Sequence, residues 1–169
     1  REAAEEGIVL LKNEGLLPLK KDTKIALLGI GAEKTIKGGT GSGDVNNRES
    51  VSIYAGMKEK NAGIVSEEWL KDYHNRYEQA RTEWKEQILE AAKHVDNPFD
   101  AYAANPFAMP DCRAVTNEDI EAAEAAVYVI SRISGEGKDR RKRKGDYYLS
   151  DQEEKDLYFL NEQKIPTVL

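Results

Sequence analysis

The chain lacks the residues on which several kinds of site depend. It has a single cysteine, Cys112, among 169 residues, so an internal disulfide is excluded. No second cysteine or histidine stands near Cys112 at the spacing of metal ligands. Both histidines, His74 and His94, fall in one long helical pattern, which disfavours a serine–histidine pair. We therefore expect neither a metal nor another cofactor.

Long hydrophobic runs and an excess of basic charge are also missing. No apolar run approaches the length of a membrane span, and no signal peptide is visible. The net charge of −6 argues against nucleic acid as the main partner. The basic cluster at residues 138–144 contains an acid and no aromatic residue, so we interpret it as a solvated loop rather than a nucleic-acid or membrane patch.

These absences favour a cytoplasmic protein. The chain begins at Arg1 rather than at a methionine, and it ends at Leu169 inside a predicted strand. We therefore expect a piece of something longer, and secretion stays open because both ends read as truncated.

What remains is the pattern of one soluble α/β domain, with 40% hydrophobic and 33% charged residues. Short apolar runs predict buried strands at residues 24–30, 125–131 and 165–169. Helices are predicted at residues 2–13, 50–60 and 67–94, and two more begin at the capping pairs Thr116–Asp119 and Ser150–Glu153. Strands that alternate with helices predict a three-layer sandwich with a mostly parallel sheet, which three strands leave incomplete.

The longest periodic segment, residues 67–94, carries an aromatic stripe. Its apolar residues recur at steps of three and four: Trp69, Tyr73, Tyr77, Ala80, Trp84, Ile88 and Ala91. Core or interface packing explains such a stripe better than a ligand site does. Prolines and asparagines at residues 96–113 then predict an irregular surface excursion. We place a helical and irregular insertion at about residues 61–115 of the domain.

Two loops after predicted strands carry side chains suited to chemistry. Glu136 stands between two glycines shortly after the strand at 125–131, where a carboxyl group could transfer protons. A solvated turn residue is the other interpretation of the same pattern. Ser42 lies between Gly41 and Gly43 in the loop after the first strand. In a parallel sheet both loops lie at the same edge, so we expect Ser42 and Glu136 to share a pocket.

The loop at residues 38–44 fits a nucleotide poorly. It lacks the lysine of a P-loop, and its glycines do not follow the dinucleotide spacing G-x-G-x-x-G. A nucleotide-binding domain remains the least favoured of our hypotheses.

The order of the motifs resembles one known family. The opening residues 3–15, Leu17-Pro18-Leu19, the strand at 24–31, the Gly-Ser-Gly-Asp loop at 41–44, residues 134–140 and residues 145–150 occur in the order found in the α/β sandwich domain of family 3 glycoside hydrolases. The resemblance covers nearly the whole chain and is weakest at residues 61–113. It identifies the chain as similar to the sandwich domain of the family's β-glucosidases.

The resemblance implies a retaining mechanism. Glu136 matches the family's acid/base residue, and Ser42 matches a serine that contacts the sugar at the non-reducing end, in a loop shaped by Gly41 and Gly43. Asp139 and Arg140 are expected to hold the acid loop by pairing rather than to do chemistry. The nucleophile is an aspartate of a (β/α)8-type barrel that this chain lacks, so the expected partners are that barrel and a β-linked glucoside.

Two alternatives stay open beside a β-glucosidase part that is inactive alone. A β-xylosidase-type enzyme has the same sandwich, because the barrel mainly selects the sugar. A non-catalytic carbohydrate-binding or assembly module would keep the fold and use the long aromatic helix as its interface. A homo-oligomer is compatible with any of these.

Overall fold

A parallel sheet forms the centre of the molecule. The computed structural model describes residues 2–39, 49–60, 62–135 and 139–169. In that part of the chain, four strands pair in the order β2-β1-β3-β4, and every pairing is parallel. Their bounds are Lys24–Leu28 (β1), Gly63–Ile64 (β2), Ala125–Tyr128 (β3) and Thr167–Val168 (β4). This confirms the predicted α/β class, with one strand more than the sequence indicated.

The two central strands are buried because helices cover the sheet. The register pairs Ile25 with Ala125 and Leu28 with Tyr128. Leu27 and Leu28 have no exposed surface, and Tyr128 keeps only 1%. Continuous apolar runs such as Ile25–Leu28 are what a sheet covered on both faces requires. The predicted strands at 24–30 and 125–131 are thus confirmed, each somewhat shorter than expected.

Strand β2, which the sequence did not predict, pairs with β1 over only two residues. Beyond them, a side chain rather than the backbone makes the hydrogen bonds to β1. Beyond Ile64, the Ser66 hydroxyl accepts a hydrogen bond from Leu27 N and donates one to Leu27 O, each 2.8 Å long. Ser66 is 2% exposed. A single hydroxyl therefore satisfies both backbone groups of Leu27 on this side of β1, just before the chain enters the long helix.

The helices mostly follow the predicted pattern. Their bounds are Glu2–Glu6 (α1), Ile53–Glu59 (α2), Glu67–Ala91 (α3), Ala92–His94 (η1), Pro98–Ala104 (α4), Asn117–Ile120 (α5) and Asp151–Glu162 (α6). Both predicted capping boxes are present, Thr116 with Asp119 and Ser150 with Glu153. No helix in the described part of the chain is both long and apolar enough to cross a membrane.

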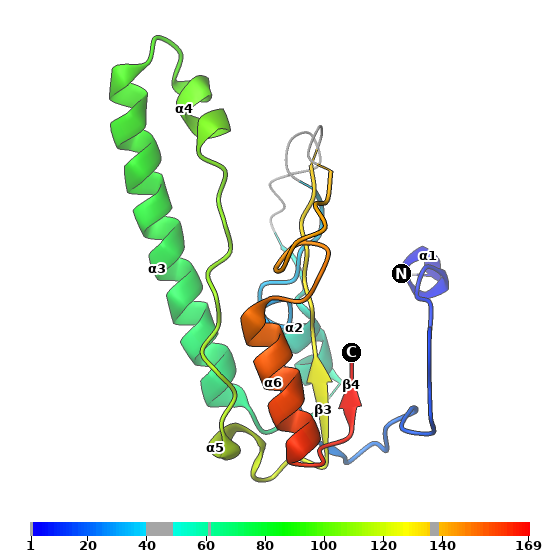
Figure 1. Cartoon of the computed structure of the whole chain (residues 1–169). Helices are drawn as coiled ribbons and strands as arrows, with labels where there is room; N and C mark the ends of the chain where they lie inside the picture. Colours follow the sequence, from blue (N-terminus) through cyan, green and yellow to red (C-terminus); the bar gives the residue numbers. More distant parts are fainter. Residues whose placement is uncertain (1, 40–48, 61, 136–138) are drawn as a thin grey trace.

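Two predictions about the helices were wrong. The helix expected at 2–13 ends at Glu6, and Ile8, Val9, Leu10 and Leu11 are 61–92% exposed. The arm that carries α1 stands apart from the sheet in Figure 1, so its apolar residues are not buried against any described part of the chain, and a short helix is marginal alone. In the excursion at 96–113, Asn97-Pro98 does not break structure but starts α4, because Asn97 caps it and Pro98 fits its first turn.

Only half of the large apolar residues in and just before α2 pack against the core. Tyr54 and Met57 pack against the core, whereas Val51 is 70% exposed and Ile53 is 36% exposed. The helix starts at Ile53 rather than at Ser50, because the Ser52 hydroxyl caps it by accepting from Ala55 N. Val51 therefore lies before the cap and outside the helical face.

The aromatic stripe of α3 has two separate roles. Trp69 and Tyr73 stack with ring centroids 6.2 Å apart, and both are buried in the sheet's core. Farther along, Trp84 packs edge-on against Phe107 and Tyr102 and donates its indole N–H to Asn105 O at 2.7 Å. Figure 1 shows α3 continuing past the strands with α4 folded back beside it. The outer part of the stripe thus closes a helical hairpin.

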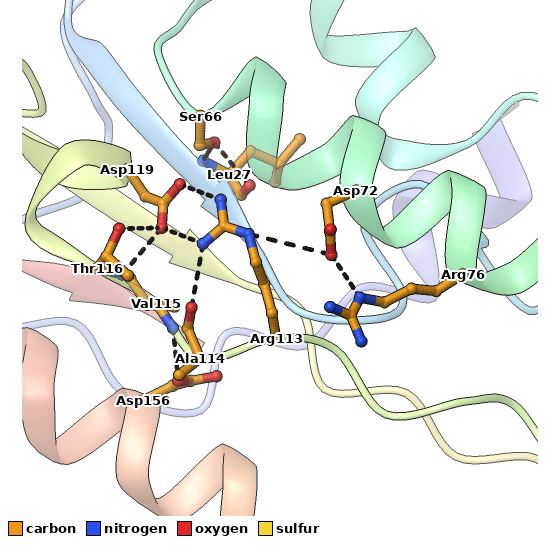
Figure 2. A network of polar contacts seen from close by, with 10 residues as sticks. All are labelled: Leu27, Ser66, Asp72, Arg76, Arg113, Ala114, Val115, Thr116, Asp119 and Asp156. Atoms are coloured by element: carbon orange, nitrogen blue, oxygen red, sulfur yellow. Dashed lines mark hydrogen bonds and ion pairs between the residues drawn. The ribbon is translucent and has the colours of Figure 1, made fainter.

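A polar network ties the segment before α5 to the helices (Figure 2). Arg113 forms two hydrogen bonds of 2.6 and 2.7 Å with Asp119 and lies 4.0 Å from Asp72 of α3. Burial raises the pKa of Asp119, but its bonds with Arg113 and Thr116 outweigh that effect and hold the pKa below its ordinary value. The carboxylate is therefore ionised at neutral pH.

Asp156 of α6 is the most deeply buried carboxylate of this network. It is 1% exposed and accepts hydrogen bonds from Tyr128 OH at 2.9 Å and from Val115 N at 3.0 Å. One carboxylate thereby joins α6, strand β3 and the segment before α5. Nearby, burial raises the pKa of the Cys112 thiol to about 12, so this cysteine stays protonated and inert.

We predict that Ser66→Ala lowers the free energy of unfolding by about 2–4 kcal/mol, because both backbone groups of Leu27 lose a buried partner. Urea denaturation measures this. The matched control is Ser52→Ala, which removes a hydroxyl from the cap of α2 and should cost only about 1 kcal/mol. Equal losses for the two variants would contradict the role given to Ser66.

Candidate functional site

The four residues expected to meet the substrate lie outside the described parts of the structure. Glu136 falls in the gap at 136–138, and Ser42, Gly41 and Gly43 fall in the gap at 40–48. Asp139 and Arg140 are described, and both are exposed. The candidate site is therefore built from the chain segments that lead into the two loops.

The register of the sheet brings these two segments to the same edge. Strands β1 and β3 are parallel neighbours, and Leu28 pairs with Tyr128 at their carboxyl ends. Just past the strands, Val129 N donates to Leu28 O at 2.8 Å. In Figure 1 the chains rise from these strands side by side. This edge is where ligands bind in open α/β sheets.

Glycines allow the two segments to stay in contact beyond the strands. A side chain at Gly29, whose φ is +88°, would place Cβ 2.4 Å from Val129 O. At Gly39 a Cβ would lie 2.5 Å from Ser134 O. Real Cβ atoms do not approach an oxygen so closely, so both positions require glycine. The residue before the Ser42 loop therefore touches the residue two before Glu136.

The base of the first loop is closed by its own hydrogen bonds. The Thr35 hydroxyl donates to Gly31 O at 2.7 Å and accepts from Ile53 N at 3.0 Å. Tyr54 N also donates to Ala32 O at 2.9 Å. The outgoing and returning arms of the loop are thereby held together where they leave the sheet.

Helix α3 clamps the outgoing arm from the side. Glu33 contacts His74 Nδ1 at 2.9 Å, and Lys34 Nζ donates to Glu78 Oε1 at 2.8 Å. The same ammonium lies 4.6 Å from the centre of the Tyr77 ring. The hydrogen bond from Lys34 lowers the pKa of Glu78. The long helix thus fixes the arm that leads to the Ser42 loop.

Arg132 organises the second loop, and sequence reasoning missed it. Its guanidinium donates to the carbonyl oxygens of Ser131 and Asp146, each at 2.8 Å, and of Tyr148 at 3.2 Å. It also forms a two-pronged pair with the Glu153 carboxylate. The only signal in the sequence was an arginine directly after the strand, in the run that carries Glu136.

Glu153 is held in turn by the start of α6. Burial raises its pKa, but Arg132 and Ser150 together hold the pKa below its ordinary value. Its carboxylate accepts from Ser150 N at 2.7 Å, completing the capping box. The carboxylate that the sequence predicts as a cap therefore also receives Arg132.

Arg140 and its basic neighbours pair with acids close by. Arg140 lies 3.3 Å from Asp146 Oδ1, and Arg141 N donates to Asp146 Oδ2 at 2.9 Å. These contacts lower the pKa of Asp146, the bond from Arg141 N most strongly. Lys144 pairs with Asp151 and Glu154 of α6. Within residues 2–39, 49–60, 62–135 and 139–169, no group of three or more His, Cys, Asp or Glu side chains could hold a metal ion.

We predict that Gly39→Ala separates the two segments, because its Cβ would meet a backbone oxygen that only a backbone shift can move. The free energy of unfolding should fall by about 1–3 kcal/mol, and the amide NMR signals of Ser134 and Gly135 should move. Gly56→Ala is the control, since its Cβ would lie 3.7 Å from Val51 and in a helix. Unmoved signals at Ser134 and Gly135 in the Gly39 variant would refute the contact.

Two curated proteins that are similar to this chain are both β-glucosidases. The chain is 33% identical over 141 residues to β-glucosidase A of Butyrivibrio fibrisolvens, a match that covers 83% of this chain and 15% of the relative. It is 30% identical over 156 residues to a β-glucosidase of Ruminococcus albus, which covers 90% of this chain and again 15% of the relative. The chain thus spans a small part of the curated relatives it matches.

Solved structures agree with these relatives. The structure of β-glucosidase 3B from Thermotoga neapolitana in complex with glucose matches with a TM-score of 0.69 and 35% identity, over 98% of this chain and 22% of that one. A β-glucosidase from Paenibacillus barengoltzii matches with a TM-score of 0.63 and 27% identity, over 95% of this chain and 16% of that one.

The matching family model is that of the glycosyl hydrolase family 3 C-terminal domain, and it covers residues 8–169. Because the model accounts for nearly all of the chain, this protein belongs to the glycosyl hydrolase family 3 C-terminal domain family.

Proposed function

We propose that this chain is the acid/base-bearing domain of a retaining β-glucosidase that removes terminal β-D-glucosyl residues from glucosides or oligosaccharides. Its family and the names of its relatives support the reaction class. The contact of Gly39 with Ser134 carries the assignment of the site, because it joins the segments that lead into the Ser42 loop and the Glu136 loop. This contact supports a common pocket for the two loops.

In the proposed mechanism Glu136 acts twice. It first donates a proton to the departing glycosidic oxygen while an aspartate of the barrel attacks the anomeric carbon. It then removes a proton from the water that hydrolyses the glycosyl-enzyme intermediate. Retention requires the two carboxyl groups to lie about 5 Å apart, on opposite sides of the scissile bond.

The other predicted residues have supporting roles in this proposal. Ser42 hydrogen-bonds the sugar at the non-reducing end, and Gly41 and Gly43 let the backbone approach it. Arg140 steadies the acid loop, and its pairing with Asp146 supports that role. We assign Asp139 to the same loop support. The barrel selects the sugar, so a β-xylosidase-type reaction is the nearest alternative.

One observation favours an assembly role in addition. Four consecutive hydrophobic residues, Ile8 to Leu11, lie 61–92% exposed beside α1. Such a run is unusual on a free surface and is typical of an interface. The barrel or a second copy of this chain would cover it.

We predict that the purified 169-residue chain hydrolyses no aryl β-glucoside, because it holds only one of the two carboxyl groups that the reaction needs. A chromogenic assay tests this. Hydrolysis that Glu136→Gln abolishes would contradict the proposed division of the site between domains.

We also predict that Glu136→Ala in the full-length enzyme lowers kcat/KM about 10²–10⁴-fold for a glucoside with a poor leaving group, the usual contribution of a general acid. Azide should restore turnover of activated substrates as β-glucosyl azide, because a small anion can replace the missing base. Glu121→Ala is the control, an exposed glutamate after α5. A Glu136 variant as active as the wild type would end the assignment.

A further inference from the structure

Arg132 uses every hydrogen-bond donor that it has. A guanidinium carries five N–H groups. In this structure Nε donates to Asp146 O, Nη1 to Ser131 O and Glu153 Oε1, and Nη2 to Tyr148 O and Glu153 Oε2. The side chains of Arg132 and Glu153 are only 18% and 8% exposed. Because all five donors of this partly buried arginine are used, its side chain fixes the positions of the carbonyls and the carboxylate that it contacts.

These contacts close the base of the loop that contains Glu136. Ser131 lies where the loop leaves the sheet, and Asp146 and Tyr148 lie where it returns toward α6. Glu136 stands between these points in the sequence. Three backbone carbonyls from both arms of the loop therefore converge on one side chain.

The far side of the arginine is anchored in the core. Glu153 belongs to the first turn of α6, where its N–H donates to the capping Ser150 hydroxyl at 3.1 Å and its carboxylate accepts from Ser150 N at 2.7 Å. One turn later, Asp156 accepts from Tyr128 OH of β3 at 2.9 Å. Helix α6 thus links the central sheet, through Asp156, to the base of the loop, through Glu153 and Arg132.

We propose that Arg132 is the positioning residue that aims Glu136 for proton transfer to the leaving oxygen. This inference rests on the proposed function, in which Glu136 is the general acid. Arg132 does not touch the substrate in this scheme; it holds the backbone where the loop that contains Glu136 leaves the sheet and where it returns to α6. A lysine cannot replace it, because an ammonium has three donors and no fork that matches a carboxylate.

Leaving-group dependence tests the proposal in the full-length enzyme. The kcat/KM value reports the step that forms the glycosyl-enzyme intermediate. A 2,4-dinitrophenyl glucoside needs little protonation in that step, whereas an alkyl glucoside needs it fully. Arg132→Lys should lower kcat/KM about 10–100-fold on the alkyl glucoside and less than about threefold on the dinitrophenyl glucoside, since a misplaced acid loses only its own contribution.

Lys144→Met is the matched control. Lys144 also ties this loop to α6, through Asp151 and Glu154, but its side chain is 54% exposed. Its loss should leave both kcat/KM values unchanged. Thermal unfolding of each variant shows that it is folded. Where Arg132→Lys does not fold, Glu153→Gln serves instead, because it keeps the size of the side chain and should show the same leaving-group pattern at smaller amplitude.

Equal losses on the two substrates, or no loss on either, would overturn the positioning role of Arg132. Glu136→Ala separates this failure from that of the proposed function. If Glu136→Ala loses activity on the alkyl glucoside while Arg132→Lys does not, only the inference about Arg132 falls. If Glu136→Ala behaves as the wild type, both fall.

Discussion

The parallel pairing of β1 with β3 is the constraint on which the rest of the molecule depends. These strands are distant in sequence, yet their register sets Leu28 beside Tyr128 and sends both chains out of the sheet at the same edge. Two loops that the sequence separates by about a hundred residues thereby begin as neighbours. Gly29 and Gly39 keep the two segments in contact beyond the strands. Because they have no side chain, the backbone of the segment after β3 can lie directly against them.

Each loop then receives support from a different helix. The outgoing arm of the first loop is clamped to α3 through Glu33 and Lys34. The second loop is tied to α6 through Arg132 and Glu153. Because α6 is itself joined to β3 by Asp156, and α3 to β1 by Ser66, both supports lead back to the central strand pair. The described segments that lead toward the proposed site residues are therefore tied to the central strands of the sheet.

Features with local signals could be read from the sequence. The long helix has a regular apolar period, and Thr116–Asp119 and Ser150–Glu153 are capping pairs with a fixed spacing. Features that depend on tertiary contacts could not. Strand β2 is two residues long and is continued by the Ser66 hydroxyl, which no periodicity reveals. The helix at the N-terminus stops early because its apolar face has nothing in the described part of the chain to pack on.

The candidate site shows the same division. A resemblance between motifs could name Glu136 and Ser42, because such motifs are contiguous in the chain. It could not identify Arg132, whose role arises only when residues 131, 146, 148 and 153 come together. Asn97-Pro98 was misread for a related reason: proline both interrupts a helix and begins one, and only the Asn97 cap distinguishes the two cases.

The hairpin formed by α3 and α4 has an evolutionary consequence. Beyond Glu78, the described ring contacts of Trp84 are with Tyr102 of α4 and with Phe107 of the segment that directly follows α4. Its outer half is thus a self-contained unit, held by its own rings and by the bond from Trp84 to Asn105. Lineages can lengthen, shorten or decorate such a projection without repacking the sheet. Natural variation in this family should therefore accumulate in the projection sooner than in the strands that carry it.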